Sequence, residues 1–179
     1  MNVDINLVLE KYFTEILFKK GEFLLIAGEL EEYLYYLHTG VVRLFYADNM
    51  VDTEITLDFF FEGDFFCGYE SFKNLTPSKI NIQAIENVKA YRIHREKFYD
   101  LLNSDNNIKD LTITMLDNIL IGKINKDIMQ QSLSYEKRYL YILENEPRII
   151  QSVPLKYIAS YIGIAQQSLS RIRRRVFLT

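Results

Sequence analysis

The most constraining stretch of this 179-residue chain is PLKYIASYIGIAQQSLSRIRRRV, residues 154–176. Ala159 is small enough for two helices to cross closely, and four residues later Gly163 is able to adopt the positive φ of a tight turn. The pattern therefore predicts two short helices joined by a turn, each with one buried face. The apolar residues at helical spacing around the turn are Ile158, Ile162, Ile164, Leu169 and Ile172.

The second of these helices keeps a polar face whose side chains suit the major groove of DNA. Glutamine can bind adenine N6 and N7 as a pair, and arginine can bind guanine O6 and N7 in the same way. An ordinary helical hairpin with a solvated basic face is the alternative interpretation. The polar residues of this face are Gln166, Gln167, Ser170, Arg171, Arg173 and Arg174, and Arg175 follows them.

Charge is distributed unevenly along the chain. The net charge is −3, but residues 151–179 contain five basic residues and no acidic ones, so the remaining residues carry −8. An acidic body with a basic end suits a protein that touches a polyanion with one end only. This favours DNA over a second hypothesis, in which a ligand-sensing barrel uses its helical tail to bind a protein partner.

The N-terminal half has the pattern of a small β-protein. A short helix is predicted over Asn2–Phe13, and from Ile16 to His94 short β-rich runs alternate with turn residues. Seven or more such runs predict a compact antiparallel barrel or roll. Lys79–Ala84 and Lys89–His94 are expected to close it as a pair of strands, with Glu86 and Asn87 in the turn.

From Arg95 the period becomes helical again, with a short segment to Leu102 and a long one from about Ser104 to Ser132. One apolar stripe on the long helix would suffice to pack on the barrel, so two predict that the second packs on another copy of the chain. A helix buried wholly within one chain is the alternative. The stripes are Ile108, Leu111, Met115 and Ile119, and Leu116, Leu120, Ile124 and Ile128.

The end of the helical region is read from its caps and prolines. A further helix is predicted to begin at Ser134, and Pro147 and Pro154 are expected to bracket a loop before the final helix pair. Gly122 lies within the long helix and should cost about 1 kcal/mol relative to alanine, unless the close approach of a partner backbone compensates.

Several classes of protein are disfavoured. The lone cysteine, Cys67, excludes an internal disulfide and a thiol cluster, and the two histidines, His38 and His94, form no H-x-H pair. Neither a catalytic nor a metal site is therefore predicted. No run approaches the roughly 18 apolar residues of a membrane span, and the N-terminus lacks a basic segment followed by a cleavage site. We expect a cytoplasmic protein that has no membrane partner.

Three stretches in this order resemble the cyclic-AMP receptor protein and fumarate–nitrate regulator family of bacterial transcription factors: residues 15–45, EGDFFCGYESF at 62–72, and IASYIGIAQQSLSRIRRR at 158–175. The resemblance implies an α+β fold. An N-terminal antiparallel β-roll, a jelly roll of the cyclic-nucleotide-binding type, would occupy residues 1–103 and sense an effector. A dimerisation helix would span residues 104–133, and a helix-turn-helix DNA-binding domain residues 134–179.

The resemblance further implies a homodimer that binds a two-fold symmetric DNA site and changes transcription, and it leaves RNA polymerase open as another partner. Gln166, Gln167 and Arg171 lie where the family reads base edges, and Ser168 lies where it contacts phosphate. We assign the arginines 173–175 to the DNA backbone, where they add affinity without sequence information.

The expected effector site is the stretch that resembles the family's phosphate-binding cassette. Its candidate residues are Gly68, Tyr69, Glu70, Ser71, Ser78 and Lys79, which we call the cassette residues. The later segment lacks the family's arginine, and Lys79 supplies a point charge but no bidentate fork. The sequence therefore puts cyclic-nucleotide binding in doubt and indicates no certain cofactor. The expected partner of this site is an unknown small-molecule effector. Because aromatic residues surround the site, they favour an effector that is more apolar than a nucleotide.

Two other departures concern the DNA-binding end. Ala165 stands where the family has a serine or threonine that caps the helix. The missing cap should lower the stability of this helix by about 1 kcal/mol. The sequence also ends at Thr179, so the helix-turn-helix is expected without a full β-hairpin wing.

Overall fold

The computed structural model of the chain describes residues 5–48 and 53–178. Within these ranges eight strands form two four-stranded sheets, with the orders β1-β8-β3-β6 and β2-β7-β4-β5. This confirms the predicted antiparallel roll. The strands are β1 (Thr14–Phe18), β2 (Phe23–Leu25), β3 (Tyr33–Thr39), β4 (Val42–Asp48), β5 (Thr53–Phe60), β6 (Phe65–Phe66), β7 (Asn81–Ala84) and β8 (Val88–His94).

The predicted pairing of the last two strands is wrong. β7 pairs with β2 and β4 in one sheet, whereas β8 pairs with β1 and β3 in the other. The segment around Glu86 and Asn87 therefore carries the chain from one sheet to the other. Alternating apolar residues indicate which side of a strand is buried, but they do not identify its neighbour.

The roll is filled by inward-facing side chains of both sheets. Leu37, Ile82 and Ala90 are fully buried between the sheets. Three aromatic rings stack inside the same core, with ring centroids 5.3 Å apart for Tyr35 and Phe66 and 5.0 Å apart for Phe60 and Phe66. The aromatic residues of this region thus act mainly as core, although Tyr69 is exposed.

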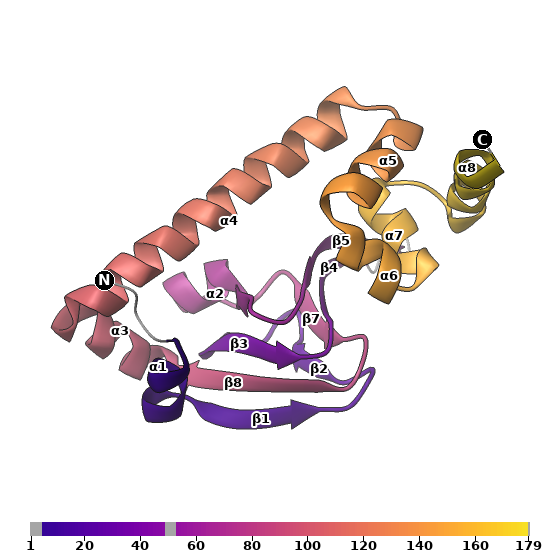
Figure 1. The fold of residues 1–179 in the computed structure, drawn as a ribbon. Coiled ribbons are helices and arrows are strands. Elements are labelled where there is room, and N and C mark those ends of the chain that lie inside the picture. The colour runs from indigo at the N-terminus through magenta and orange to yellow at the C-terminus, as the bar shows by residue number, and fades with distance from the viewer. Residues whose placement is uncertain (1–4, 49–52, 179) are drawn as a thin grey trace.

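Eight helices complete the described part of the chain (Figure 1). The long α4 runs from α3 at one end of the roll to α5 at the other. Its buried residues, Ile108 and Met129, lie near its two ends. The helices are α1 (Ile5–Tyr12), α2 (Tyr69–Asn74), α3 (Arg95–Ser104), α4 (Asn106–Ser132), α5 (Tyr135–Asn145), α6 (Pro147–Ser152), α7 (Leu155–Ile162) and α8 (Gln166–Leu178).

Most predicted helix limits agree with these bounds. Within the predicted N-terminal helix, Ile5–Tyr12 form α1, and residues 2–4 of the predicted range lie outside the described residues. Ser134 caps α5, because its hydroxyl accepts a hydrogen bond from the N–H of Lys137. The loop predicted after Pro147 is wrong, since residues 147–152 form α6. Proline fits the first turn of a helix, where its missing N–H needs no partner.

The C-terminal helices do not form a separate body. Phe59 and Phe61 of the roll belong to the same buried cluster as Tyr139 of α5 and Ile158 of α7. One hydrophobic core therefore connects the roll to the C-terminal helices. No helix in the described ranges combines the length and apolar character needed to cross a membrane.

Candidate nucleic-acid interface

The turn between α7 and α8 depends on Gly163. Its φ is 90°, a conformation that strains residues with a side chain. The N–H of Gly163 donates to the carbonyl oxygens of Ala159 and Ser160, at 3.0 and 3.1 Å, and the N–H of Ile164 also donates to Ala159. These bonds use the free carbonyls at the end of α7. The chain then continues directly into α8.

The apolar residues predicted around the turn are indeed buried. Ile158, Ile162, Leu169 and Ile172 have exposed fractions of 6% or less, and Ile164 is half-buried. Ala159 is also buried, as expected for a point of close helix approach. The sequence pattern therefore identified the inner faces of both helices correctly.

The predicted DNA-binding residues lie on the opposite side of α8. Seven of them are exposed and Arg173 is half-buried. At 100° per residue, they cover a continuous arc away from Leu169 and Ile172. The structure thus brings Gln166, Gln167, Ser168, Ser170, Arg171, Arg173, Arg174 and Arg175 to one surface.

Two arginines orient this helix pair relative to the rest of the chain. Arg175 forms an ion pair with Glu136 of α5, with its Nη2 3.1 Å from Glu136 Oε2. Arg138 of α5 donates to the carbonyl oxygens of Leu133 at 3.0 Å and Ile162 at 2.9 Å, and also to that of Gln130. Its guanidinium therefore connects the end of α4 to the end of α7. The sequence pattern gave no sign of either contact.

Ala165, immediately before α8, accepts hydrogen bonds only through its backbone carbonyl, from the N–H groups of Ser168 and Leu169. Its methyl group provides no side-chain acceptor for the first turn. The structure thus shows the uncapped start that the sequence predicts, at the end of α8 that carries the two glutamines.

The cassette residues are occupied by contacts within the chain. The Ser71 hydroxyl accepts the N–H of Glu31 at 2.9 Å, and the Ser78 hydroxyl donates to the carbonyl of Ile80 at 2.8 Å. Lys79 and Glu70 are exposed and form an ion pair with each other at 2.6 Å. Gly68 is buried, and a Cβ there would lie 2.5 Å from Leu25. Tyr69 is the exposed first residue of α2.

Sequence reasoning missed Glu31, the buried carboxylate of this region. Only 2% of Glu31 is exposed, and its carboxylate accepts the N–H groups of Gly68 at 3.0 Å and Tyr33 at 3.1 Å. Burial raises the pKa of Glu31 to about 7 from an ordinary value of 4.5, although these hydrogen bonds favour the charged form. A glutamate in the polar run GELEE is normally expected to be solvated, so no sequence signal distinguished it.

Cys67, next to the cassette, has no disulfide partner and packs in a cluster with Leu34, Phe72 and Ile93. Burial raises the pKa of its thiol, which keeps the reactive thiolate unpopulated at neutral pH. Cys67 therefore acts as a packed apolar side chain rather than as a reactive group.

The second apolar stripe of α4 is open to solvent. The exposed fractions of Leu120, Ile124 and Ile128 are 59%, 49% and 57%, while Leu116 is half-buried. On the first stripe Ile108 is buried, Leu111 and Met115 are half-buried, and Ile119 is exposed. The first stripe therefore packs on the chain itself more extensively than the second.

Comparisons with known proteins agree with this architecture. The family model of the cyclic nucleotide-binding domain matches residues 15–105. No curated protein sequence matches the chain. The fold is that of FixK2 from Bradyrhizobium japonicum, with 18% identity, a TM-score of 0.80, and 93% of this chain and 85% of that chain covered.

Two further solved structures have the same fold. The c-di-GMP responsive global regulator CLP of Xanthomonas campestris is 17% identical, with a TM-score of 0.73 and with 97% of this chain and 90% of that chain covered. The catabolite activator protein of Thermus thermophilus is 20% identical, with a TM-score of 0.57 and coverage of 96% and 81%. These similarities confirm the predicted resemblance in fold.

Proposed function

Because the chain belongs to the cyclic nucleotide-binding domain family, through residues 15–105, we propose that it is a cytoplasmic, homodimeric transcription regulator that binds specific DNA sequences. The exposed polar arc of α8, opposite a fully buried apolar face, carries this proposal. CLP and the catabolite activator protein, which share the fold, are named as regulators, and this supports a role other than catalysis.

α8 is the helix that enters the major groove in this proposal. Gln166, Gln167 and Arg171 read base edges, since glutamine and arginine are the side chains that form paired bonds to adenine and guanine. Ser168 and the arginines 173–175 contact phosphate, and Ser170 lies on the same exposed face. Arg175 is held near α5 by Glu136, so it contacts the backbone rather than the bases.

The dimer forms along α4. Leu116, Leu120, Ile124 and Ile128 repeat every four residues along one side of α4, and the last three expose about half of their surface or more in the single chain. Packing against the same stripe of a second copy would remove these side chains from water. A two-fold dimer places two α8 helices on successive major grooves of one DNA face, roughly 34 Å apart.

The roll regulates this dimer without a requirement for a cyclic nucleotide. The polar groups of Ser71, Ser78, Glu70 and Lys79 are already bonded within the chain. An effector, if it enters the roll, must displace these bonds or use apolar contacts with the neighbouring aromatic side chains. RNA polymerase is the partner through which a dimer bound near a promoter would change transcription.

The test is selection of binding sites from random DNA, followed by fluorescence anisotropy at several salt concentrations. Arg171→Ala should lose about 10- to 100-fold in affinity and relax selectivity at one base pair, whereas Arg174→Ala should weaken all sequences equally and lower the salt slope by about 1. Arg148→Ala, an exposed arginine of α6, is the control and should leave binding unchanged. Salt-independent binding, or recovery of a protein partner instead of DNA, would contradict the proposal.

A further inference from the structure

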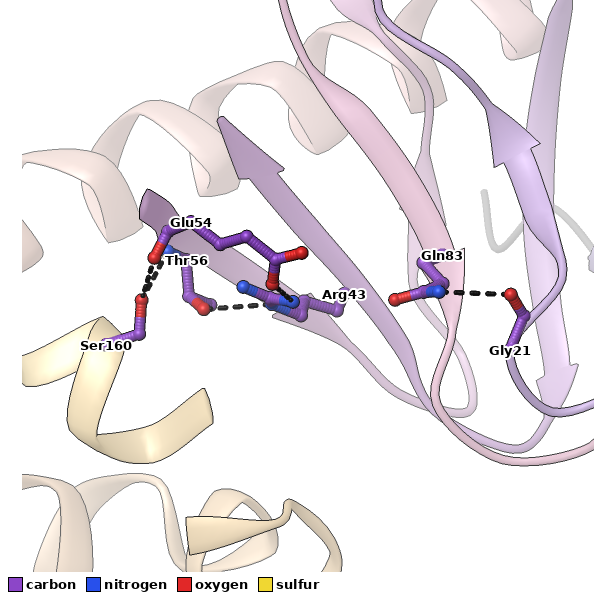
Figure 2. Close-up of polar contacts among 6 residues, drawn as sticks. All are labelled: Gly21, Arg43, Glu54, Thr56, Gln83 and Ser160. Carbon is purple, nitrogen blue, oxygen red and sulfur yellow. Dashed lines mark hydrogen bonds and ion pairs between the residues drawn. The ribbon is translucent and has the colours of Figure 1, made fainter. Parts of the chain in front are cut away.

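The edge of one sheet is completed by a side chain from α7. β5 is the last strand in the order β2-β7-β4-β5, so its outer edge is not paired with another strand of the described ranges. Ser160 supplies one: its hydroxyl accepts the N–H of Thr56 at 2.9 Å and donates to the carbonyl of Glu54 at 2.8 Å (Figure 2). A single hydroxyl therefore satisfies a donor and an acceptor of the edge strand.

The side chains of the same two β5 residues bind a buried arginine. Arg43 of β4 is only 1% exposed, and it donates to the Thr56 hydroxyl at 2.9 Å and to the Glu54 carboxylate at 2.7 Å (Figure 2). Its guanidinium also lies 4.0 Å from the ring centre of Tyr157, which is on α7. We call these five residues, Arg43, Glu54, Thr56, Tyr157 and Ser160, the β5–α7 junction.

The β5–α7 junction is a defined polar contact within an otherwise apolar interface. Tyr157 and Ser160 are three residues apart, so both side chains leave α7 on the same face. Next to them the rings of Phe59 and Tyr161 lie 5.4 Å apart. A buried guanidinium and a hydroxyl that both donates and accepts add bonds whose geometry depends on direction, which apolar contacts do not supply.

Polar contacts therefore hold α7 both at its C-terminal end and on its face toward the roll. Arg138 connects its C-terminal end to the end of α4, and the β5–α7 junction connects its face to the roll. The β5–α7 junction adds bonds in the middle of α7, away from the bond to Arg138 at its C-terminal end. Because α8 follows α7 after the short turn at Gly163, any pivot of α7 would move α8 as well.

Building on the proposed function, we propose that Arg43 and Ser160 are positioning residues for DNA recognition: they fix α7 on the roll and thereby set the distance between the two α8 helices of the dimer. The roll then helps to determine which spacing of DNA half-sites the dimer binds. Neither residue touches DNA in this arrangement. Their effect is on spacing selectivity rather than on the strength of phosphate contact.

The experiment uses the full-length dimer and the site selected by the wild-type protein. Duplexes are made in which the two half-sites are moved together or apart by one, two or three base pairs, and affinity is measured for each. The wild-type protein should prefer one spacing by about 10-fold or more, since each base-pair step rotates and displaces a half-site.

Ser160→Ala and Arg43→Met should flatten this spacing profile at least about threefold, while the salt slope and the dimer mass by light scattering stay unchanged. Ser160→Thr, which retains the hydroxyl, should restore it. Ser104→Ala is the matched control, because its hydroxyl donates to the Asp100 and Leu101 carbonyls within its own helix, α3. Ser160→Ala removes only one oxygen and keeps the experiment informative if Arg43→Met does not fold.

The inference is overturned if folded Ser160→Ala and Arg43→Met dimers keep the wild-type spacing profile. That outcome differs from failure of the proposed function, in which the wild-type protein itself would bind no DNA selectively.

Discussion

The cassette end of the roll and the outer face of α8 both carry polar side chains but use them in opposite ways. At the cassette, Ser71, Ser78 and the Glu70–Lys79 pair are bonded within the chain. Along α8, most of the glutamine, serine and arginine side chains extend into solvent. The first region uses its polarity to stabilise one fold, and the second leaves its polarity available to another molecule.

This difference shows that the residue types of a site do not establish that it binds a ligand. A buried polar group must be bonded, since leaving it unpaired costs about 1–3 kcal/mol. An exposed one is bonded to water and can exchange that water for a base or a phosphate. The open apolar stripe of α4 belongs with α8 in this respect, because it too exposes groups that a partner could cover.

The largest expected effect is on the α4 stripe. Ile124→Glu places a charge in the centre of the proposed helix pair, where it would be desolvated or repelled by its copy. We expect a monomer at micromolar concentration by light scattering, and a loss of about 100-fold or more in DNA affinity because one half-site remains. Asn118→Glu, on another exposed side of α4, is the control. A dimeric Ile124→Glu protein would show that this stripe is not the interface.

The second largest effect is expected from a substitution at Gly163, in the turn that precedes α8. Gly163→Ala should lower the free energy of unfolding by roughly 1–2 kcal/mol, because its φ of 90° is unfavourable for alanine. An added Cβ would meet nothing closer than Arg138 Nη1 at 3.8 Å, so the cost is conformational rather than steric.

Gly122→Ala is the matched comparison, since an added Cβ has no neighbour within 4 Å there. The free energy of unfolding of that variant should rise by about 1 kcal/mol, measured by thermal or denaturant unfolding. A destabilised Gly122→Ala dimer would instead indicate close approach of the partner backbone at this point.

Burial of Glu31 beside the cassette residues should make the stability of the protein depend on pH. The pKa of Glu31 is raised to about 7 in the folded chain, so between its ordinary value of 4.5 and about 7 the folded state binds more protons than the unfolded state. The unfolding free energy should therefore fall as pH rises through this window, and Glu31→Gln should reduce that fall.

Denaturant titrations at several pH values measure this effect. Asp64 and Glu146, whose pKa values are also raised by burial, should leave a smaller slope of the same sign. An unchanged slope in Glu31→Gln would show that Glu31 is not the titrating group.

The smallest expected effect is that of a cyclic nucleotide. Cyclic AMP or cyclic GMP at about 1 mM should shift the melting temperature by less than about 1 °C, because a ligand stabilises a protein only when its concentration exceeds its Kd. A saturable rise in the melting temperature would show that the cassette binds a phosphate. Its polar groups would then be available to a ligand, as those of α8 are.

Local patterns predicted much of this structure. The apolar spacing around Gly163 gave both helices, their buried faces and the turn, since a helix of 3.6 residues per turn places these positions on one side. The spacing on α4 likewise predicted two apolar stripes, and the structure shows that the one containing Ile108 is the better buried. In each case the signal and the structure lie within one element.

What failed depends on partners that are distant in sequence. The separation of β7 and β8 into different sheets could not be read from their alternation, and α6 was hidden by prolines that mark both loops and helix starts. The burial of Glu31 and the β5–α7 junction arise only when residues 37 to 106 positions apart come together.

The sequence by itself therefore determined the order of the elements, the inner face of each helix and the polar character of α8, because periodicity and composition act within one segment. Only the tertiary structure decided which polar groups remain available. Ser71 and Arg171 are equally polar in the sequence. One is bonded to the backbone of Glu31 and the other is exposed, because burial and bonding geometry depend on what the rest of the chain places beside them.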